Sequence, residues 1–486
     1  MKISIKNLFL LTFLVVISLA LHRKELNQFP KYIHAWAQSD YYALSLGFID
    51  NEFDFSHPQN FVQNPQFPDY FHTPKDNGIT AADFPIHTYS VALLMKLTGS
   101  EEPRVFRSYT LFFSIVGLFA LFLLIKELNG SDVKALFVIG LILLSPVYLY
   151  YRAGFLPTIP SLSNVIIAYY FYLKYLKTNR FRFFNWSILF FTLATLARTP
   201  FAIFLIAVFC QEGLTIIKQK KFNYRVLISF TLSFSLIIGY FIYNAFLRSK
   251  YGSLFLSKPL TPESWEEVKR LTVSALENWK FHYLTKWHYL FVLAASLLSV
   301  FQFIKRRPLS DLHKKLLLQF SIALFGAILY SLLMLQQFKA HDYYFLDTYF
   351  TPFILFTAFT VTYIKFNHFY LNLITFAIMG FAINGMLTHS LDAQVQRKQT
   401  GAWDKTLFTI QNYANGDELL TTLNIPRESK LLILDSEAPN IPFILLRRYG
   451  YSVHSLTKDN IKNKLDWNYD YIVMQDNNAQ DILSSI

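Results

Sequence analysis

The 486-residue chain contains a single cysteine, Cys210, and only 16% of its residues are charged. One cysteine excludes an internal disulfide framework. The scarcity of charge accompanies 53% hydrophobic residues, among them 50 Phe and 30 Tyr. This is more apolar surface than one soluble core of this size can bury, so the composition predicts a membrane protein.

The chain also lacks the signatures of several soluble enzyme classes. It has no P-loop, no dinucleotide-binding fingerprint and no Ser-His-Asp order typical of a hydrolase. It has no convincing internal repeat, which disfavours a transporter built from inverted halves. The net charge of +13 does not indicate nucleic acid, because the basic residues fall in short clusters between apolar runs.

Apolar windows of roughly 20 residues predict about 11 transmembrane helices. No small-x-small cleavage site precedes His22, so the first window is predicted to be an uncleaved span. Two windows are separated only by Arg198-Thr199-Pro200 and could form a shallow pair, which leaves the number open by about two. The windows lie near 5–22, 105–126, 135–151, 159–176, 185–197, 200–217, 226–247, 287–304, 316–336, 346–365 and 368–388.

The basic clusters divide the loops between two sides of the membrane. KYLKTNRFR, KQKKFNYR and KRRPLSDLHKK fall on one side, which is therefore predicted to be cytoplasmic together with the N-terminus. The chain is then a multi-pass protein of the inner (plasma) membrane, and its long loops 22–104 and 248–286 lie on the periplasmic or extracellular side. Because binding groups gather on loops held by a rigid scaffold, we expect the chemistry on that outer face.

From about residue 390 the pattern changes to short apolar runs such as LLILDSEAPN and YDYIVMQD. This pattern predicts a small soluble α/β domain over 390–486, outside the membrane, after a transmembrane domain over 1–389 that includes the outer loop 22–104. A helix is also predicted from Pro85 to Leu97 in the first loop. Another should follow in the second long loop, capped by Thr261 or Glu263.

Two acidic residues of the first outer loop are candidates for chemistry. Asp40 lies in HAWAQSDYYALSLGFID, and Asp83 lies in ITAADFPIHTYSVALLMKLTG with His87 one turn further on. Helix capping is the simplest structural role for each of them, and Pro85 in a first helical turn suits it. Two such carboxylates in one loop can also face a single cavity, where they could take a proton from a hydroxyl group.

Cations gather at the predicted outer ends of the spans. Lys339 and His341 lie in FKAHDYY, and Arg107, Arg152 and Arg198 lie at the outer ends of other spans. A snorkelling lysine beside an interfacial tyrosine belt would account for KAHDYY. Outer-face cations also suit an anionic lipid headgroup, and carboxylates beside cations suit transfer from a lipid phosphate.

SDYYALSLGF, DFPIHTYSVALLMKLTG and EEPRVFRSYTLFFSIVGLFALFLLIKEL together resemble the opening of the GT-C superfamily of integral membrane glycosyltransferases. The likeness is greatest to glycosyltransferase family 39, the dolichyl-phosphate-mannose protein mannosyltransferases and the aminoarabinose lipid A transferases. KAHDYY is similar to a basic and aromatic segment that these proteins have before a late span. The chain departs from them at Phe84-Pro85-Ile86, where many have a basic residue and two prolines, and at Thr158, where many have an acid.

The resemblance implies an inverting transfer of a sugar from a polyprenyl-phosphate donor to a lipid, glycan or protein acceptor. Asp40 would be the general base with Asp83 assisting, and Lys339, His341 and Arg198 would bind the donor phosphate. Some relatives hold a divalent metal, for which Asp83 and His341 are the candidate ligands, although no metal-ligand spacing here requires one. The candidates for other substrate contacts are His87, Arg107, Tyr343 and Tyr344.

Two other classes of function stay open on the sequence. A carrier or flippase for a lipid-linked glycan should place ionisable residues near mid-membrane, in broken helices of related halves. An O-antigen ligase or polymerase should have its large loop late in the chain, whereas the largest loop here is the first. This chain instead concentrates its ionisable residues at one face of the membrane, so it shows neither pattern.

Overall fold

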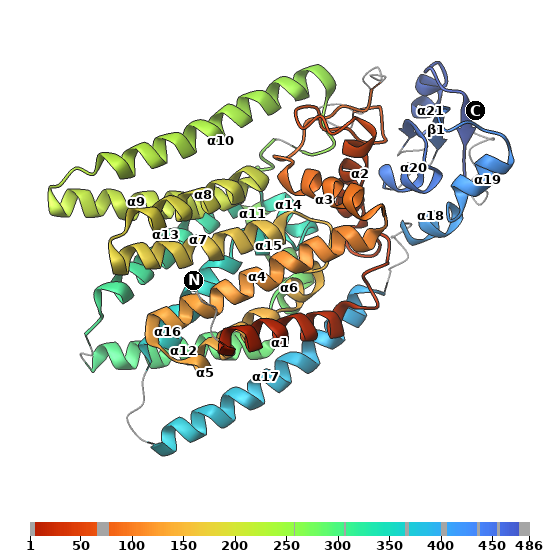
Figure 1. Ribbon diagram of the computed structural model, residues 1–486. Coiled ribbons are helices and arrows are strands. Elements are labelled where there is room, and N and C mark those ends of the chain that lie inside the picture. The colour runs from red at the N-terminus through yellow and green to blue at the C-terminus, as the bar shows by residue number, and fades with distance from the viewer. Residues whose placement is uncertain are drawn as a thin grey trace.

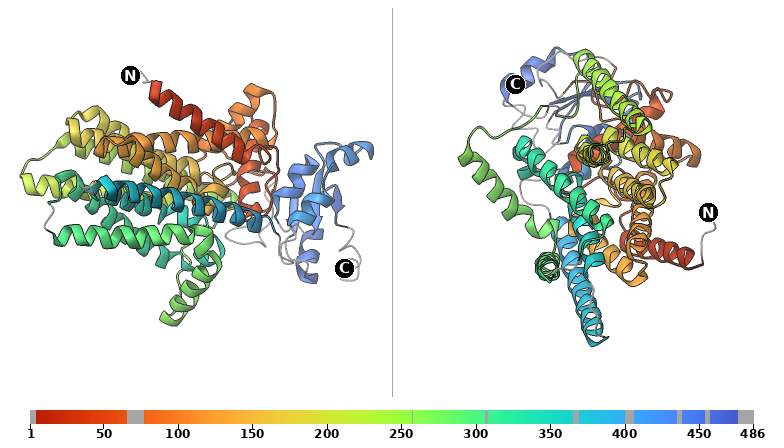
Figure 2. Two further views of the ribbon diagram at one scale, coloured as in Figure 1. Left: turned by 90° about the horizontal axis from the view of Figure 1, so that it is seen from below. Right: turned by 90° about the vertical axis from the view of Figure 1, so that its left-hand side faces the viewer.

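A computed structural model of the chain describes residues 5–65, 77–256, 258–305, 308–364, 369–399, 406–434, 438–453 and 457–475. Long helices run side by side in one body, and a small domain with a sheet lies beyond one end of it (Figure 1 and the left view of Figure 2). The protein is therefore a helical bundle with a separate C-terminal α/β part, as the sequence predicts.

Each predicted span coincides with a helix or a pair of helices. Among the described residues, six helices are long and apolar enough to cross a membrane, and α8 and α16 are shorter apolar helices. The protein is accordingly a multi-pass membrane protein. The bundle helices are α1 (Ile5–His22), α4 (Pro103–Asn129), α5 (Asp132–Leu143), α6 (Pro146–Tyr151), α7 (Thr158–Thr178), α8 (Phe181–Ala197), α9 (Ala202–Gln219), α10 (Tyr224–Tyr251), α12 (Lys286–Ile304), α13 (Asp311–Leu333), α16 (Phe350–Tyr363) and α17 (Phe369–Arg397).

The predicted span 135–151 is not one continuous helix. The window 135–151 breaks at Leu144 and Ser145, between α5 and α6. Pro146 is the first residue of α6, and proline lacks the N–H group that would continue the hydrogen bonding of α5. A similar break separates α8 from α9, where Arg198 is extended and Thr199–Phe201 form a single 3-10 turn.

Short helices cover the end of the bundle that faces the C-terminal domain. They are α2 (Ala35–Asp50), α3 (Ile86–Thr98), α11 (Trp265–Tyr283), α14 (Leu335–Ala340) and α15 (Tyr344–Asp347). Helix α3 confirms the helix predicted at Pro85–Leu97. The cap predicted for the second long loop is wrong, because Ser264, and neither Thr261 nor Glu263, accepts a hydrogen bond from a backbone N–H of α11, that of Glu267 at 3.2 Å.

Neither candidate acid is a helix cap. Asp40 lies inside α2, more than one turn beyond its first residue. Asp83 precedes α3, but the N-cap position is Pro85 and no side chain caps that helix. Helix capping therefore explains neither carboxylate.

The C-terminal domain contains a three-stranded parallel sheet in the order β2-β1-β3. Its strands are β1 (Lys430–Leu434), β2 (Tyr449–Val453) and β3 (Tyr471–Val473), and its helices are α18 (Thr406–Asn412), α19 (Gly416–Thr422), α20 (Asn440–Leu446) and α21 (Lys458–Leu465). Leu431 pairs with Gly450, and Leu432 pairs with Ile472. Helix α17 continues through residue 390, where the domain boundary is predicted, and ends at Arg397.

Labelling of single cysteines tests the predicted orientation. In a Cys210→Ser background, Ser56→Cys should react with a membrane-impermeant maleimide on intact cells, because the exposed Ser56 belongs to the first loop. Lys305→Cys, at the exposed end of α12, should react only after permeabilisation, because basic loops stay cytoplasmic. The opposite pattern would reverse the topology.

Candidate active site

Helix α2 directs two neighbouring side chains to different surroundings. Consecutive residues of an α-helix point about 100° apart. The hydroxyl group of Tyr41 donates a hydrogen bond of 2.6 Å to Asp83. The carboxyl group of Asp40 instead accepts a hydrogen bond of 2.8 Å from Asn440 of the C-terminal domain. Asp40 and Asp83 are therefore linked through one helix, but they do not share a single cluster.

Asp83 belongs to a charged cluster built around Arg198. The carboxylate of Asp83 is 29% exposed and lies 3.4 Å from the guanidinium group of Arg198, which also pairs with the buried Asp347. The same guanidinium group lies over the rings of Tyr343 and Tyr344, 5.6 and 5.8 Å from their centroids. The extended backbone of Arg198 between α8 and α9 lets its side chain reach both carboxylates.

A second cluster lies next to the first and centres on Asp342. One oxygen of Asp342 lies 3.2 Å from the ring of His34 and accepts a hydrogen bond of 2.6 Å from Tyr151. The other accepts a hydrogen bond of 2.6 Å from Arg397. Burial raises the pKa of Asp342, but Arg397 and His34 outweigh it and lower the pKa below its usual range, so this carboxylate stays ionised.

The predicted phosphate-binding residues differ in charge. The ring of His341 stacks on that of His34 with their centroids 5.0 Å apart, and Tyr343 lies edge-on to it. Burial and the neighbouring His34 lower the pKa of His341 to about 4, so the ring is neutral at neutral pH. Lys339 is exposed on the same short segment. Of the three predicted phosphate-binding residues, Lys339 and Arg198 therefore carry the positive charge.

Asp40 is more deeply buried than Asp83, the other candidate acid. Its side chain is buried at 2% exposure between α2 and α20. Burial raises the pKa of Asp40 to about 8, while the hydrogen bond from Asn440 lowers it. A carboxyl group that titrates near neutral pH is suited to proton transfer, whereas one on an open surface titrates near 4.

Three comparisons with known proteins bear on this arrangement. Residues 82–243 match the family profile described as dolichyl-phosphate-mannose-protein mannosyltransferase. The crystal structure of the apo oligosaccharyltransferase of Archaeoglobus fulgidus is similar, with a TM-score of 0.54 and 15% identity over 91% of this chain and 64% of that one. The archaeal oligosaccharyltransferase AglB from Archaeoglobus fulgidus, in complex with an inhibitory peptide and a dolichol-phosphate, gives a TM-score of 0.54 and 13% identity over 97% of this chain and 69% of that one.

The fold is similar to that of this archaeal oligosaccharyltransferase. The chain spans about two thirds of the length of the archaeal oligosaccharyltransferase, 64% by the apo structure. ArnT from Cupriavidus metallidurans, in the apo state, gives a TM-score of 0.47 and 8% identity over 98% of this chain and 94% of that one. No curated protein sequence matches this chain.

The segment 82–243 that matches the family profile contains the ion pair of the first cluster. It begins one residue before Asp83 and includes Arg198, but it ends before Lys339 and begins after Asp40. The sequence similarity therefore covers the Asp83–Arg198 pair together with His87 and Arg107. The other candidates, Asp40, Lys339, His341, Tyr343 and Tyr344, lie outside the matched segment.

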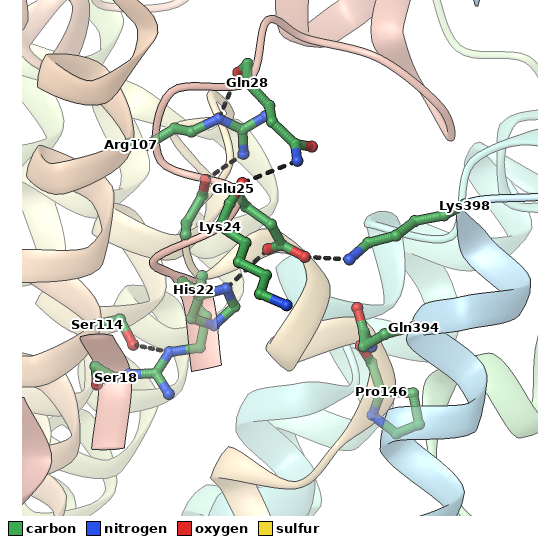
Figure 3. A network of polar contacts seen from close by, with 12 residues as sticks. Ser18, His22, Lys24, Glu25, Gln28, Arg107, Ser114, Pro146, Gln394 and Lys398 are labelled. Atoms are coloured by element: carbon green, nitrogen blue, oxygen red, sulfur yellow. Dashed lines mark hydrogen bonds and ion pairs between the residues drawn. The ribbon is translucent and has the colours of Figure 1, made fainter. Parts of the chain in front are cut away.

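Two of the predicted substrate contacts lie apart from both clusters. His87 points to Tyr109 of α4, 2.8 Å from its hydroxyl group, and burial lowers the pKa of His87 to about 3. Arg107 donates to the backbone carbonyls of Gln28 and Ala153, at 2.9 and 2.7 Å, on the network that joins α1 to α4 and α17 (Figure 3). Both side chains hold neighbouring helices of the bundle together, and neither contacts Asp83.

The candidate metal ligands do not fit a metal ion in this arrangement. Among the described residues, no group of three His, Cys, Asp or Glu side chains is placed to hold one. Arg198 and the hydroxyl group of Tyr41 already contact one oxygen of Asp83. A cation at that oxygen would compete with Arg198, so we assign no step to a metal.

Several residues of the site were not selected from the sequence. His34 and Tyr41 flank Asp40 in the segment around it, and Asp342 and Asp347 lie in or beside KAHDYY. His34 has a left-handed backbone (φ 56°, ψ 35°), a conformation that non-glycine residues adopt mostly at turns and functional sites. Arg397 and Asn440 come from distant parts of the chain, and no local pattern marks either of them.

Proposed function

We propose that this protein is an inverting glycosyltransferase that moves a sugar from a polyprenyl-phosphate-linked donor to a lipid, glycan or protein acceptor, on the outer face of the inner membrane. The observation that carries the proposal is the Asp83–Arg198–Asp347 cluster at the domain-facing end of a GT-C bundle. The arginine of this cluster is suited to binding the phosphate of a lipid-linked donor.

In this proposal the transfer is a single displacement, and α2 carries both the base, Asp40, and Tyr41, which contacts the phosphate-binding cluster. Asp40, on the side of the C-terminal domain, takes the proton from the acceptor hydroxyl group. The acceptor oxygen then bonds to the anomeric carbon as the bond from that carbon to the phosphate oxygen breaks. On the bundle side, Arg198 and Lys339 stabilise the negative charge of the departing polyprenyl phosphate.

Asp83 has a positioning role in this scheme. Its carboxylate is bonded to Tyr41 and Arg198 and therefore fixes the direction of the guanidinium group. The ring faces of Tyr343 and Tyr344 pack against the Arg198 guanidinium group and stabilise it by cation–π interaction. An arginine held in this way loses little conformational freedom when a phosphate binds.

A polar network inside the bundle bears on the alternative of a carrier. Tyr172 donates a hydrogen bond of 2.6 Å to Glu212, and Gln211 connects Tyr172 with Gln319. Ionisable residues within spans are often part of a transport path. Here these side chains bond to one another across α7, α9 and α13, so the network serves helix packing and does not favour a carrier.

A donor panel tests the proposed reaction. Purified protein in lipid nanodiscs should release polyprenyl phosphate from at least one polyprenyl-phosphate sugar, and the product should have the inverted anomeric configuration by NMR. Nucleotide sugars serve as the control and should give no turnover, because the proposed site takes a donor that is anchored in the lipid by its polyprenyl chain. Turnover of a nucleotide sugar, or retention of configuration, would contradict the proposal.

A further inference from the structure

The first loop extends the sheet of the C-terminal domain. Residue Val62 forms a parallel bridge with Gly450 of β2. The N–H of Gln63 donates to the carbonyl of Gly450 at 2.7 Å, and the N–H of Gly450 donates to the carbonyl of Phe61 at 3.2 Å. Position 450 must be glycine (φ 156°), because a side chain there would overlap the carbonyl of Leu431 in the neighbouring strand β1.

Side chains fix the same contact. The amide of Asn64 donates to the carbonyl of Ser452 at 3.1 Å and accepts from its N–H at 2.8 Å. The ring of Phe61 stacks on that of Tyr449 with their centroids 4.8 Å apart. Arg447 pairs with Glu101 at 2.7 Å on the far side of the contact. The domain is therefore held on the loop at several points, and these points determine where α20 lies.

Helix α20 brings a single amide to Asp40. Asn440 is its first residue and is fully buried, and the other residues of the helix are apolar. Its side-chain N–H group donates to Asp40 at 2.8 Å. Around this pair, Ala35 of α2 packs with Ala438 and Ile441 in an apolar cluster. The amide is thus a polar group that the C-terminal domain places in an otherwise apolar contact.

The titratable groups of the neighbouring elements face other partners. On α2, Tyr41 faces Asp83, Tyr42 faces the carbonyl of Glu101, and Asp50 faces Tyr449. His87 of α3 faces Tyr109, and Arg447 after α20 faces Glu101. Helix α20 itself has no titratable side chain. Burial raises the pKa of Asp40 and the Asn440 amide lowers it, and no charged group contributes.

We propose that Asn440 is a positioning residue for Asp40: the C-terminal domain, docked on the first loop, supplies the amide that orients this carboxylate and keeps it able to ionise. The inference rests on the proposed function, in which Asp40 is the base. A hydrogen bond donated to a carboxylate favours its charged form. Docking of the domain therefore acts on Asp40 in two ways: it buries the carboxyl group, which raises its pKa, and it supplies the amide that orients the carboxylate and favours its charged form.

An infrared pH titration of the full-length protein tests this coupling without depending on activity. The protonated carboxyl band that is missing in Asp40→Asn reports the titration of Asp40. Asn440→Ala should move its midpoint upward by about one pH unit, the size expected for a lost hydrogen bond to a charged group. The rising limb of the pH profile of kcat should move by the same amount.

The matched control is Asn64→Ala, which removes an amide of the same type from the same domain contact. It should leave the Asp40 midpoint unchanged, because Asn64 bonds only to Ser452 in this contact. An equal shift in both variants would reduce Asn440 to a structural residue and overturn the inference. An unchanged midpoint in Asn440→Ala would overturn it as well.

A second variant covers the case in which Asn440→Ala does not fold. Asn440→Asp keeps the shape but places a second carboxyl beside the first, and two neighbouring carboxyls cannot both ionise easily. Its midpoint should therefore lie well above that of the wild type, and a lower midpoint would contradict the proposal. If Asp40→Asn retained full activity while these shifts occurred, the base assignment would fail and the positioning contact would stand.

Discussion

Replacing Asp40 with asparagine is expected to lower kcat by a factor of about 10² to 10⁴, the usual contribution of a general base. Asparagine keeps the size of the side chain and can still bond to Asn440, so the contact between α2 and α20 survives. It cannot take a proton from the acceptor hydroxyl group. The donor KM should change little, because in the proposed reaction Arg198 and Lys339, and not Asp40, hold the donor phosphate. The measurement is steady-state transfer with a saturating acceptor.

The raised pKa of Asp40 also predicts the direction in which kcat and folding stability change with pH. With a pKa of about 8, the fraction of ionised Asp40 rises as the pH rises, so wild-type kcat should increase up to about pH 8 and then level off. Folding stability should change in the opposite direction. A carboxyl whose pKa is raised by folding binds more protons in the folded state than in the unfolded state. Its contribution to the free energy of unfolding therefore falls as the pH rises from about 4 to 8.

Asp50→Asn is the matched control for this substitution. Asp50 lies at the end of the same helix and accepts a hydrogen bond from Tyr449 of the same domain. It should lose little activity, because it lies in the domain contact and plays no part in proton transfer. Full activity in Asp40→Asn would refute the assignment of the base. Asp83, which is more exposed and already faces Arg198, would then be the next carboxylate to test.

The bundle was predictable from the sequence because hydropathy and charge act locally. An apolar window of sufficient length forms a helix in lipid whatever surrounds it, and basic clusters mark the cytoplasmic ends. The break at Pro146 was missed because the apolar run continues through it, although proline is a clear local signal. The small α/β domain was predictable for the same local reason, from its short strands.

The site was only partly predictable, because its contacts join distant segments. Asp83 and Arg198 were each selected from the sequence, but their pairing depends on how α8 and α9 meet the first loop. In KAHDYY the sequence drew attention to the cations, whereas the most buried polar residue there is Asp342. Its partner Arg397 ends the last long helix, and no periodicity could connect the two.

The buried pair of Asp342 and Arg397 should have the largest effect on stability. Both side chains are fully buried, and two further nitrogens of the guanidinium group have no hydrogen-bond partner. Asp342→Asn would leave the positive charge of Arg397 without its counter-ion in a place that water does not reach. Removing one partner of such a pair costs about 3 to 5 kcal/mol, so the thermal unfolding temperature in detergent should fall clearly.

A double substitution separates the lost ion pair from a packing defect. In Asp342→Asn combined with Arg397→Met, no buried charge remains, so the double variant should unfold at a higher temperature than Asp342→Asn alone. Asp311→Asn is the control, because its pair with Lys314 is exposed and should contribute little. If the double variant were no more stable than the single one, the damage would come from the lost contacts of Asp342 with His34 and Tyr151. These two contacts tie α2 and α6 to the segment that carries Lys339, so activity should then fall together with stability.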